Sequence, residues 1–228
     1  MKLYLIVPFI IFINSAGNSQ NNSGTAQSPT IEQLMQEKIR LLKNGALLVR
    51  LQTKENSIMA LRDAGNQDLA DQVELKQTTL NKELIKAFRE NYNFSEVYFF
   101  QSQYSEPLLK DRIEEVVFVN DDLNPDPAIK CTKKDYLTAE INVLDPDTAA
   151  YFESYYFGYG GVKKSYSGGP DMGFEALKIM NKHFVQLKDP FPYYVRTYDA
   201  ELNTDKLDKI VAKMNKKLVE FYEKNKEK

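Results

Sequence analysis

The segment from Tyr151 to Gly173 holds the residues whose types and spacing are best suited to binding another molecule. It is rich in tyrosine and carries most of the chain's ten glycines. Tyrosine offers a flat apolar ring with a polar tip, and glycine lets a backbone fit closely around a bound group. We therefore predict that these residues, here called the Tyr/Gly segment, bind a ligand or another protein. The predicted binding residues are Tyr155, Tyr156, Tyr159, Lys163, Lys164 and Tyr166.

Two alternative interpretations of the Tyr/Gly segment stay open. In one, its rings pack on the sheet as a lid and bind nothing. In the other, the segment lines the cleft of a hydrolase that acts on envelope sugars or peptides, with Glu153 and Asp171 as its carboxylates. Two carboxyl groups must lie about 5–10 Å apart to cleave a glycoside. A structure distinguishes the hydrolase from the binding protein, because the hydrolase requires two facing carboxylates in a tyrosine-lined cleft and the binding protein a flat or convex aromatic patch.

The other chemistry-bearing residues give little support for catalysis. The chain has one histidine, His183, and one cysteine, Cys131, so a zinc site built from histidine and cysteine alone cannot form. A Cys–His nucleophile pair has this one combination only. The sequence contains neither a serine-hydrolase nucleophile elbow nor a phosphate-binding glycine-rich loop. We therefore predict a non-catalytic protein that uses no cofactor and no metal.

The acidic loop at residues 120–127 is the one stretch with metal-ligand spacing. Asp122 begins a calcium-loop pattern, but Pro127 stands where an EF-hand requires glycine, and Lys133 where it requires glutamate. The alternatives are a looser calcium site and a plain turn cluster. The candidate ligands of the looser site are Asp121, Asp122, Asn124 and Asp126.

The N-terminus has the layout of a secretory signal peptide, which we assign to residues 1–17. Lys2 precedes an apolar run over residues 3–13, and small and polar residues follow. The run is too short to cross a bilayer, which takes about 20 residues; the alternative is an uncleaved anchor. Residues 18–29 form a polar linker. We expect an exported protein, periplasmic or extracellular, whose partner is an envelope ligand or protein.

Composition limits the rest of the chain, residues 30–228, to a single domain with a sizeable core. The net charge of -2 and the pI near 5.7 provide no field that would gather nucleic acid. The lone Cys131 cannot form an internal disulfide, so the fold must be held by packing. No second apolar run of membrane-spanning length follows the leader.

Hydrophobic periodicity predicts helices at both ends of the domain and a helical hairpin near its start. Thr30 and Gln33 form a capping box ahead of a helix that stops at Asn44–Gly45. Residues 54–92 predict two helices that turn at Ala64–Gly65–Asn66. The inner face of this hairpin is predicted from Leu69, Val73, Leu80, Leu84 and Phe88. The helix from Thr204 is expected to bury Leu207, Ile210, Val211, Met214, Leu218 and Phe221.

Short apolar runs between these helices predict the strands. They lie at residues 46–51, 97–100, 116–119, 136–144, 174–180 and 193–198. A short helix capped by Ser105, with Pro107 in its first turn, is expected between the second and third runs. Strands separated by helices favour an α/β fold with a mixed sheet and three layers.

The order of elements resembles a thioredoxin-like fold at the level of architecture. The closing hairpin, with Pro192 ahead of its second strand, and the last helix carry the resemblance. The redox motif of two cysteines is absent, so the resemblance implies no disulfide chemistry and allows a redox-inactive assembly factor as an alternative function. The segments at residues 42–51, 97–100 and 189–196 also resemble an uncharacterised family of exported bacterial proteins, which implies no activity.

Overall fold

The computed structural model describes residues 29–144, 151–155, 162–166, 174–197 and 206–226. For residues 151–155 and 162–166, the description covers the backbone pairing only. The signal peptide predicted at residues 1–17 lies outside the described residues, as does the linker up to residue 28.

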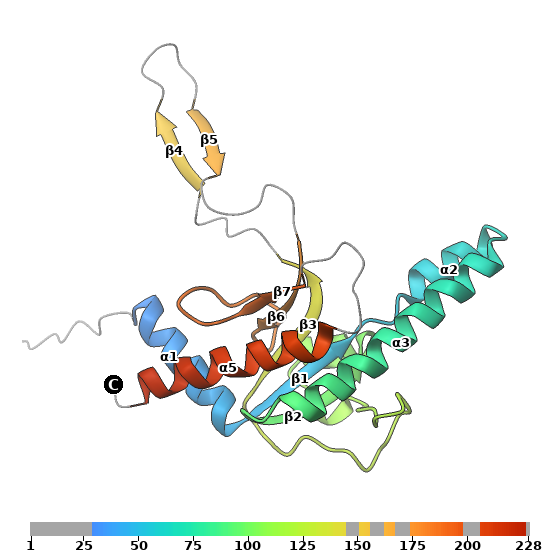
Figure 1. The fold of residues 1–228 in the computed structure, drawn as a ribbon, viewed down its shortest axis with the longest axis horizontal. Helices are drawn as coiled ribbons and strands as arrows, with labels where there is room; N and C mark the ends of the chain where they lie inside the picture. Colours follow the sequence, from blue (N-terminus) through green and yellow to red (C-terminus); the bar gives the residue numbers. More distant parts are fainter. Residues whose placement is uncertain (1–28, 145–150, 156–161, 167–173, 198–205, 227–228) are drawn as a thin grey trace, which may run out of the picture.

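A five-stranded mixed sheet forms the centre of a single α/β domain, which confirms the predicted fold class. Its strands are β1 (Ala46–Leu51), β2 (Glu96–Gln101), β3 (Tyr136–Val143), β6 (Glu175–Met180) and β7 (Tyr194–Arg196), in the order β2-β1-β3-β6-β7. Strand β1 is parallel to β2 and β3, whereas β6 is antiparallel to β3 and β7 (Figure 1). A separate antiparallel hairpin consists of β4 (Tyr151–Tyr155) and β5 (Val162–Tyr166).

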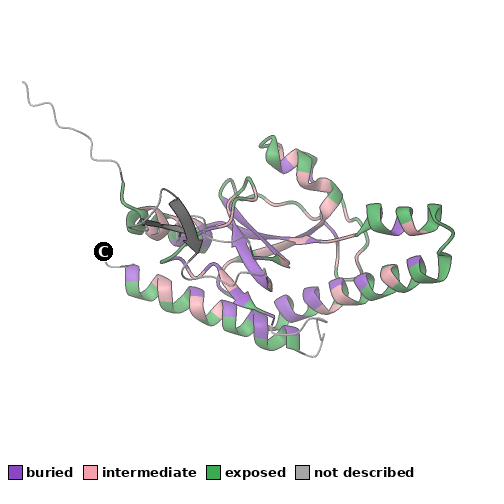
Figure 2. Cartoon of the chain, turned by 90° about the horizontal axis from the view of Figure 1, so that it is seen from above, coloured by how far each residue is buried: buried purple, intermediate pink, exposed green. Residues whose placement is uncertain are grey.

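Three long helices cover one face of the sheet: α1 (Ile31–Asn44), α3 (Gln67–Asn91) and α5 (Leu207–Asn225). Figure 2 shows buried residues along the sides of α3 and α5 that meet the sheet. The prediction for α5 is confirmed, because its inner side chains are buried and Phe221 packs against the core with its ring 5.9 Å from that of Phe191. The buried side chains of α5 include Leu207, Ile210, Val211, Met214 and Leu218.

The junction from α1 to β1 follows the sequence signals closely. The capping box is confirmed, since Gln33 N donates to Thr30 Oγ1 at 3.2 Å and Thr30 N donates to Gln33 Oε1 at 2.8 Å. Gly45 ends the helix where no side chain fits, because a Cβ there would lie 2.2 Å from the carbonyl oxygen of Asp135. The tight junction lets Ala46 N donate to that same oxygen and start β1 beside β3.

The second face of the sheet is covered by shorter elements and by an aromatic cluster. Helix α4 (Ser105–Leu109) contributes Leu108, which packs with side chains from β1, β2 and the segment after α4. These side chains form a separate cluster that includes Leu48, Phe100, Val116, Phe118 and Tyr136. The helices, the sheet and this cover make the three predicted layers.

Three predicted details of this region are wrong. Residues 116–119 form no strand, because only isolated bridges join Phe118 to Phe100 and Val119 to Pro125, whose ring lacks the N–H that a continuing ladder needs. Ser105 does not cap α4; its Oγ donates to Ser102 O at 2.5 Å. The last strand is also shorter than residues 193–198, because β7 covers only Tyr194–Arg196.

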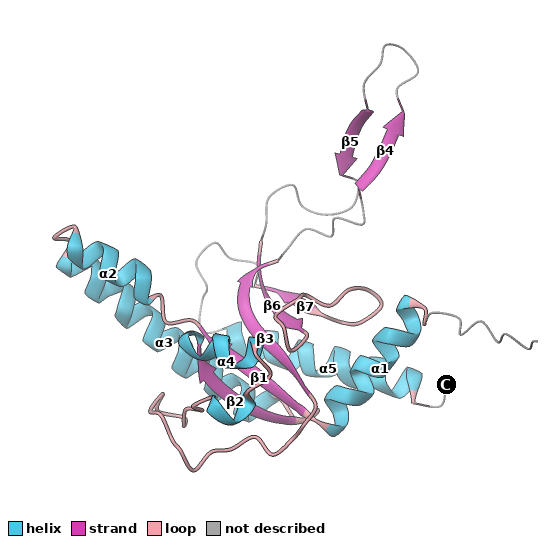
Figure 3. Ribbon diagram, turned by 180° about the vertical axis from the view of Figure 1, so that it is seen from behind, coloured by secondary structure: helices cyan, strands magenta, loops and turns pink. Residues whose placement is uncertain are grey.

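The predicted helical hairpin is confirmed as α2 (Glu55–Asp63) and α3, but its inner face differs from the prediction. Leu84 and Phe88 are buried, Val73 and Leu80 are half-buried, and Leu69 is 49% exposed. Helix α2 and the N-terminal part of α3 extend beyond the sheet in both Figure 1 and Figure 3, so Leu69 has no core to meet. Within the described part of the chain, no helix combines the length and apolarity needed to cross a membrane.

Candidate functional site

The candidate site lies at the carboxyl ends of the parallel strands β1 and β2. The connection from β1 to β2 runs through α2 and α3 on one face of the sheet, whereas the connection from β2 to β3 passes α4 on the other face. The two connections therefore leave the sheet in opposite directions around β1 (Figure 1). Ligands of open α/β sheets bind outside the carboxyl ends of the strands at such a switch point.

A row of buried charges crosses the sheet next to this edge, on the face opposite the long helices. Arg50 on β1 pairs with Glu140 on β3 at 2.9 Å, and Glu140 lies 3.7 Å from Lys178 on β6. The Glu140 carboxylate also accepts hydrogen bonds from Gln52 at 2.9 Å and Asn142 at 3.1 Å. Its side chain is only 4% exposed. A carboxylate this deep needs such partners because burying an unpaired charge is costly.

Both oxygens of Glu140 are occupied, so this carboxylate positions its neighbours. Arg50 is held from two sides, by Glu140 and by the ring of Phe184, whose centroid lies 5.2 Å from the guanidinium carbon. Its Nε is buried and has no hydrogen-bond partner among the described residues. Its side chain is 24% exposed, which leaves donor capacity at the edge of the sheet.

Arg50 lines a polar hollow of about 520 Å³, which we call the outer hollow. The hollow lies between the β1–α2 loop and the residues that follow β2. Its lining is almost entirely polar and includes Arg50, Thr53, Lys54, Glu55, Ser57 and Ser102. The loop is tied to β2, because Thr53 Oγ1 and Ser102 Oγ are hydrogen-bonded at 3.0 Å. Lys54 has a left-handed backbone with φ of 54°, a conformation found mostly at turns and sites under constraint.

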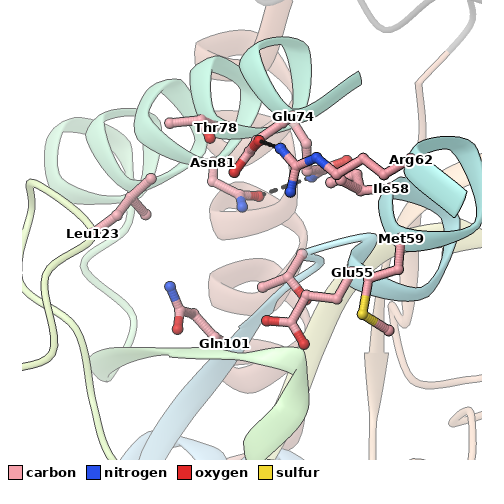
Figure 4. A pocket seen from close by; sticks show the side chains of 11 residues that line it. Glu55, Ile58, Met59, Arg62, Glu74, Thr78, Asn81, Gln101 and Leu123 are labelled. Atoms are coloured by element: carbon pink, nitrogen blue, oxygen red, sulfur yellow. Dashed lines mark hydrogen bonds and ion pairs between the residues drawn. The ribbon is translucent and has the colours of Figure 1, made fainter. Parts of the chain in front are cut away.

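A second hollow of about 280 Å³, the inner hollow, lies between α2, α3 and the end of β2. Thr53 and Glu55 line both hollows, so the two adjoin around the β1–α2 loop. Figure 4 shows Asn81 and Thr78 of α3 on one side and Gln101 of β2 on the other. The apolar lining of the inner hollow comes from Ile58, Met59 and Leu123.

Two buried amides of α3 give the inner hollow its chemistry. Asn81 donates to the carbonyl oxygen of Gln52 at 2.9 Å, and Gln77 donates to Asn81 Oδ1 at 3.0 Å. Gln77 is 5% exposed and Asn81 6%. Gln77 Oε1 accepts no hydrogen bond from any described residue. Because Gln77 Oε1 is not among the buried atoms that lack a partner, it reaches the space of the hollow, where a ligand or a water molecule can donate to it.

The rim of the inner hollow carries an ion pair. Arg62 of α2 lies 2.6 Å from Glu74 of α3 and 3.4 Å from Asp71. Hydrogen bonds to Asp71 and Glu74 raise the pKa of Arg62, so its guanidinium stays charged. The pair joins α2 to α3, and both Arg62 and Glu74 line the inner hollow (Figure 4).

No family model, curated protein or solved structure matches this chain. The function must therefore be argued from the geometry of the two hollows.

The structure places the predicted binding residues of the Tyr/Gly segment only in part. Tyr155 belongs to β4, and Lys163, Lys164 and Tyr166 belong to β5, where Tyr155 pairs with Val162. Tyr156 and Tyr159 lie outside the described residues. Binding by these six residues therefore stays a prediction. Of the two candidate hydrolase carboxylates, Glu153 lies opposite Lys164 in the backbone register of the hairpin, and Asp171 lies outside the described residues.

Cys131 and His183 show no sign of acting as a nucleophile pair. Burial raises the pKa of the Cys131 thiol, so the reactive thiolate is disfavoured. Its Sγ contacts Lys133 O at 3.8 Å. His183 is exposed, and its backbone N–H donates to Asn181 Oδ1. No interaction between the two residues occurs in the described structure.

The acidic loop is organised by its own backbone. Asn120 Oδ1 accepts hydrogen bonds from the backbone N–H groups of Asp122 and Asn124, at 3.1 and 3.0 Å. Asp126 Oδ1 accepts from Ala128 N at 2.9 Å, and Asp121 pairs with Arg89. These bonds are those of a turn cluster. Within the described ranges, no three residues of the His, Cys, Asp and Glu types come together in a way that could hold a metal.

The sequence interpretation missed Gln77 and Asn81, although a signal was present. The two residues continue the inner stripe of α3 at intervals of three or four from Val73 to Leu84 and Phe88. Amides on an otherwise apolar stripe mark a place where the helix faces polar groups.

Proposed function

We propose that the protein is an exported, non-catalytic binding domain that holds a short peptide segment in the inner hollow. The observation that carries the proposal is the buried Gln77–Asn81 pair, whose Gln77 carbonyl oxygen has no donor among the described residues. An amide both donates and accepts hydrogen bonds, as a peptide group does. A peptide N–H would donate a hydrogen bond to Gln77 Oε1, and a peptide carbonyl oxygen would accept one from the side-chain amide of Gln101.

The other lining residues favour a peptide over a sugar. Ile58, Met59 and Leu123 offer apolar contact to a small aliphatic side chain. Among the described residues, no aromatic ring lines this hollow, and a sugar would therefore have no ring here on which to stack. The volume of about 280 Å³ is close to the lower end of the range for small-ligand sites, about 300–1,000 Å³. The hollow therefore suits part of a peptide.

Binding is favoured over catalysis by the state of the reactive groups. The buried Glu140 carboxylate is fully occupied by Arg50, Gln52 and Asn142. The Cys131 thiol is half-buried with a raised pKa. Neither group is placed to act on a peptide in the inner hollow. The Tyr/Gly segment stays a second predicted binding surface.

The test is calorimetric titration with dipeptides blocked as N-acetyl and C-terminal amide, with Leu, Asp or Lys as the variable side chain. We expect the Leu peptide to bind tightest and Gln77→Leu to weaken it about tenfold, the effect of one lost hydrogen bond of about 1.4 kcal/mol. The matched control is Gln72→Leu, the same change on the exposed side of α3. The proposal fails if the wild type binds no blocked dipeptide, or if both variants bind equally.

A further inference from the structure

We infer that the outer hollow takes the C-terminal carboxylate of the peptide whose preceding residues occupy the inner hollow. The inference rests on the proposed function and names its ligand more closely, as the free carboxyl end of a chain. The two hollows adjoin at Thr53 and Glu55. A peptide that leaves the inner hollow along the β1–α2 loop therefore enters the outer one.

Arg50 is the residue that makes the outer hollow a carboxylate site. The guanidinium presents five donors in a planar fork that matches a carboxylate with two parallel hydrogen bonds. One Nη of Arg50 donates to Glu140 at 2.9 Å, and Nε is buried, so the donors left for a ligand are those of the two Nη groups that no described residue accepts. Glu140 and the Phe184 ring hold the side chain in place before a ligand arrives. Little side-chain entropy is then lost when a carboxylate binds.

Neighbouring groups add donors around the same hollow. The hydroxyls of Thr53, Ser57 and Ser102 line it, and Lys54 brings a further positive charge. Helix α2 begins here, and no side chain caps its first turn, so its first backbone N–H groups also point toward the start of the helix. These groups would add to the binding of a carboxylate, but the inference itself rests on Arg50.

Glu55 decides between a carboxylate and a more highly charged anion. Its exposed carboxylate lines the border of the two hollows. It opposes any anion, and it opposes a doubly charged phosphate more strongly than a singly charged carboxylate. The outer hollow is therefore suited to a single negative charge that arrives attached to a chain.

The test compares two peptides that differ only at the C-terminus, N-acetyl-Ala-Leu with a free carboxylate and the same peptide as its amide. Titration calorimetry is expected to show about tenfold tighter binding of the free acid. Arg50→Lys keeps the positive charge beside Glu140 but loses the planar guanidinium fork. The variant should lose most of the preference for the free acid, while its affinity for the amide stays unchanged. Arg112→Lys, on a half-buried arginine that is paired with Glu115 and lines neither hollow, is the matched control.

A second variant keeps the test valid if Arg50→Lys disturbs the fold. Glu55 is exposed, so Glu55→Gln should fold normally and should raise the preference for the free acid over the amide several-fold above that of the wild type. Equal binding of acid and amide by the wild type would overturn the inference and leave the proposed function standing. Binding of neither peptide would overturn both. Inorganic phosphate is the third probe. If it binds as tightly as the free acid and its binding depends on Arg50, the outer hollow is an anion site that does not select peptide ends, and the inference is overturned.

Discussion

The two ends of α3 differ in what they bury. Its C-terminal end places Leu84, Ile85 and Phe88 against the sheet, in the apolar core under the long helices. Where the helix passes the carboxyl ends of β1 and β2, the same stripe carries Gln77 and Asn81. One amphipathic helix thus anchors the fold at one end and forms the wall of a hollow at the other. The difference separates residues that maintain stability from residues that are available to a ligand.

The largest expected effect is at the apolar end. Phe88 is fully buried, with its ring centroid 6.0 Å from that of Phe99 and 5.5 Å from that of Tyr92. Phe88→Ala should lower the free energy of unfolding by about 3–5 kcal/mol, through lost burial and the cavity left behind. The control is Leu75→Ala at the other end, where the side chain is 69% exposed and the change should be within about 0.5 kcal/mol. Urea denaturation measures both, and similar losses would abolish the distinction between the ends.

Asn81 should give an intermediate effect. Asn81→Ala removes the donor to the carbonyl oxygen of Gln52 and the acceptor of Gln77, so it leaves two buried polar groups without partners. We expect the free energy of unfolding to fall by about 1–3 kcal/mol. The exposed Gln72→Ala, measured by the same urea titration, should have little effect. A loss for Asn81→Ala no larger than that control would mean that the amide pair is not a buried structural link.

The smallest effect concerns pH. Burial raises the pKa of Tyr92, the residue that follows α3, because its hydroxyl is removed from water. A raised pKa means that the folded protein keeps this proton when the unfolded chain loses it. The stabilisation is complete below the ordinary tyrosine value of about 10 and is lost as the pH rises above it. Stability should therefore fall on going from about pH 8 to about pH 11.

Tyr92→Phe isolates the contribution of this residue. Burial also raises the pKa of Tyr98 and Tyr136 to about 12, and those two contribute equally in both proteins. The variant should lose less stability over the alkaline range than the wild type, as measured by denaturation at the two pH values. An identical loss would show that the Tyr92 hydroxyl is not shielded by the fold.

Much of the fold could be predicted from local sequence signals. The capping box at Thr30, the turn at Gly65 and the stripe of α5 each follow from residues close in sequence, and each is present in the structure. The prediction of a strand at residues 116–119 was wrong because the role of these residues depends on contacts with parts of the chain that are distant in sequence. Val116 and Phe118 cover the second face of the sheet beside Phe100, whereas Val119 packs in the core under the long helices. An apolar run does not reveal whether it pairs as a strand.

The candidate site could not be predicted in the same way. Arg50, Glu140 and Lys178 lie far apart in the chain and meet only because β1, β3 and β6 are neighbours in the sheet. The two hollows likewise depend on where the β1–α2 loop crosses the end of β2. Gln77 and Asn81 were the one local indication, as polar residues on an inner stripe.

Backbone amide chemical shifts, recorded with and without N-acetyl-Ala-Leu, test most directly whether the carboxyl edge of β1 and β2 is the binding site. We predict that the changes concentrate in residues 50–57, 77–81 and 101–103, the three ranges that contain most of the residues lining the two hollows. Changes confined to the Tyr/Gly segment, or the absence of changes in those three ranges at saturating peptide, would contradict this account.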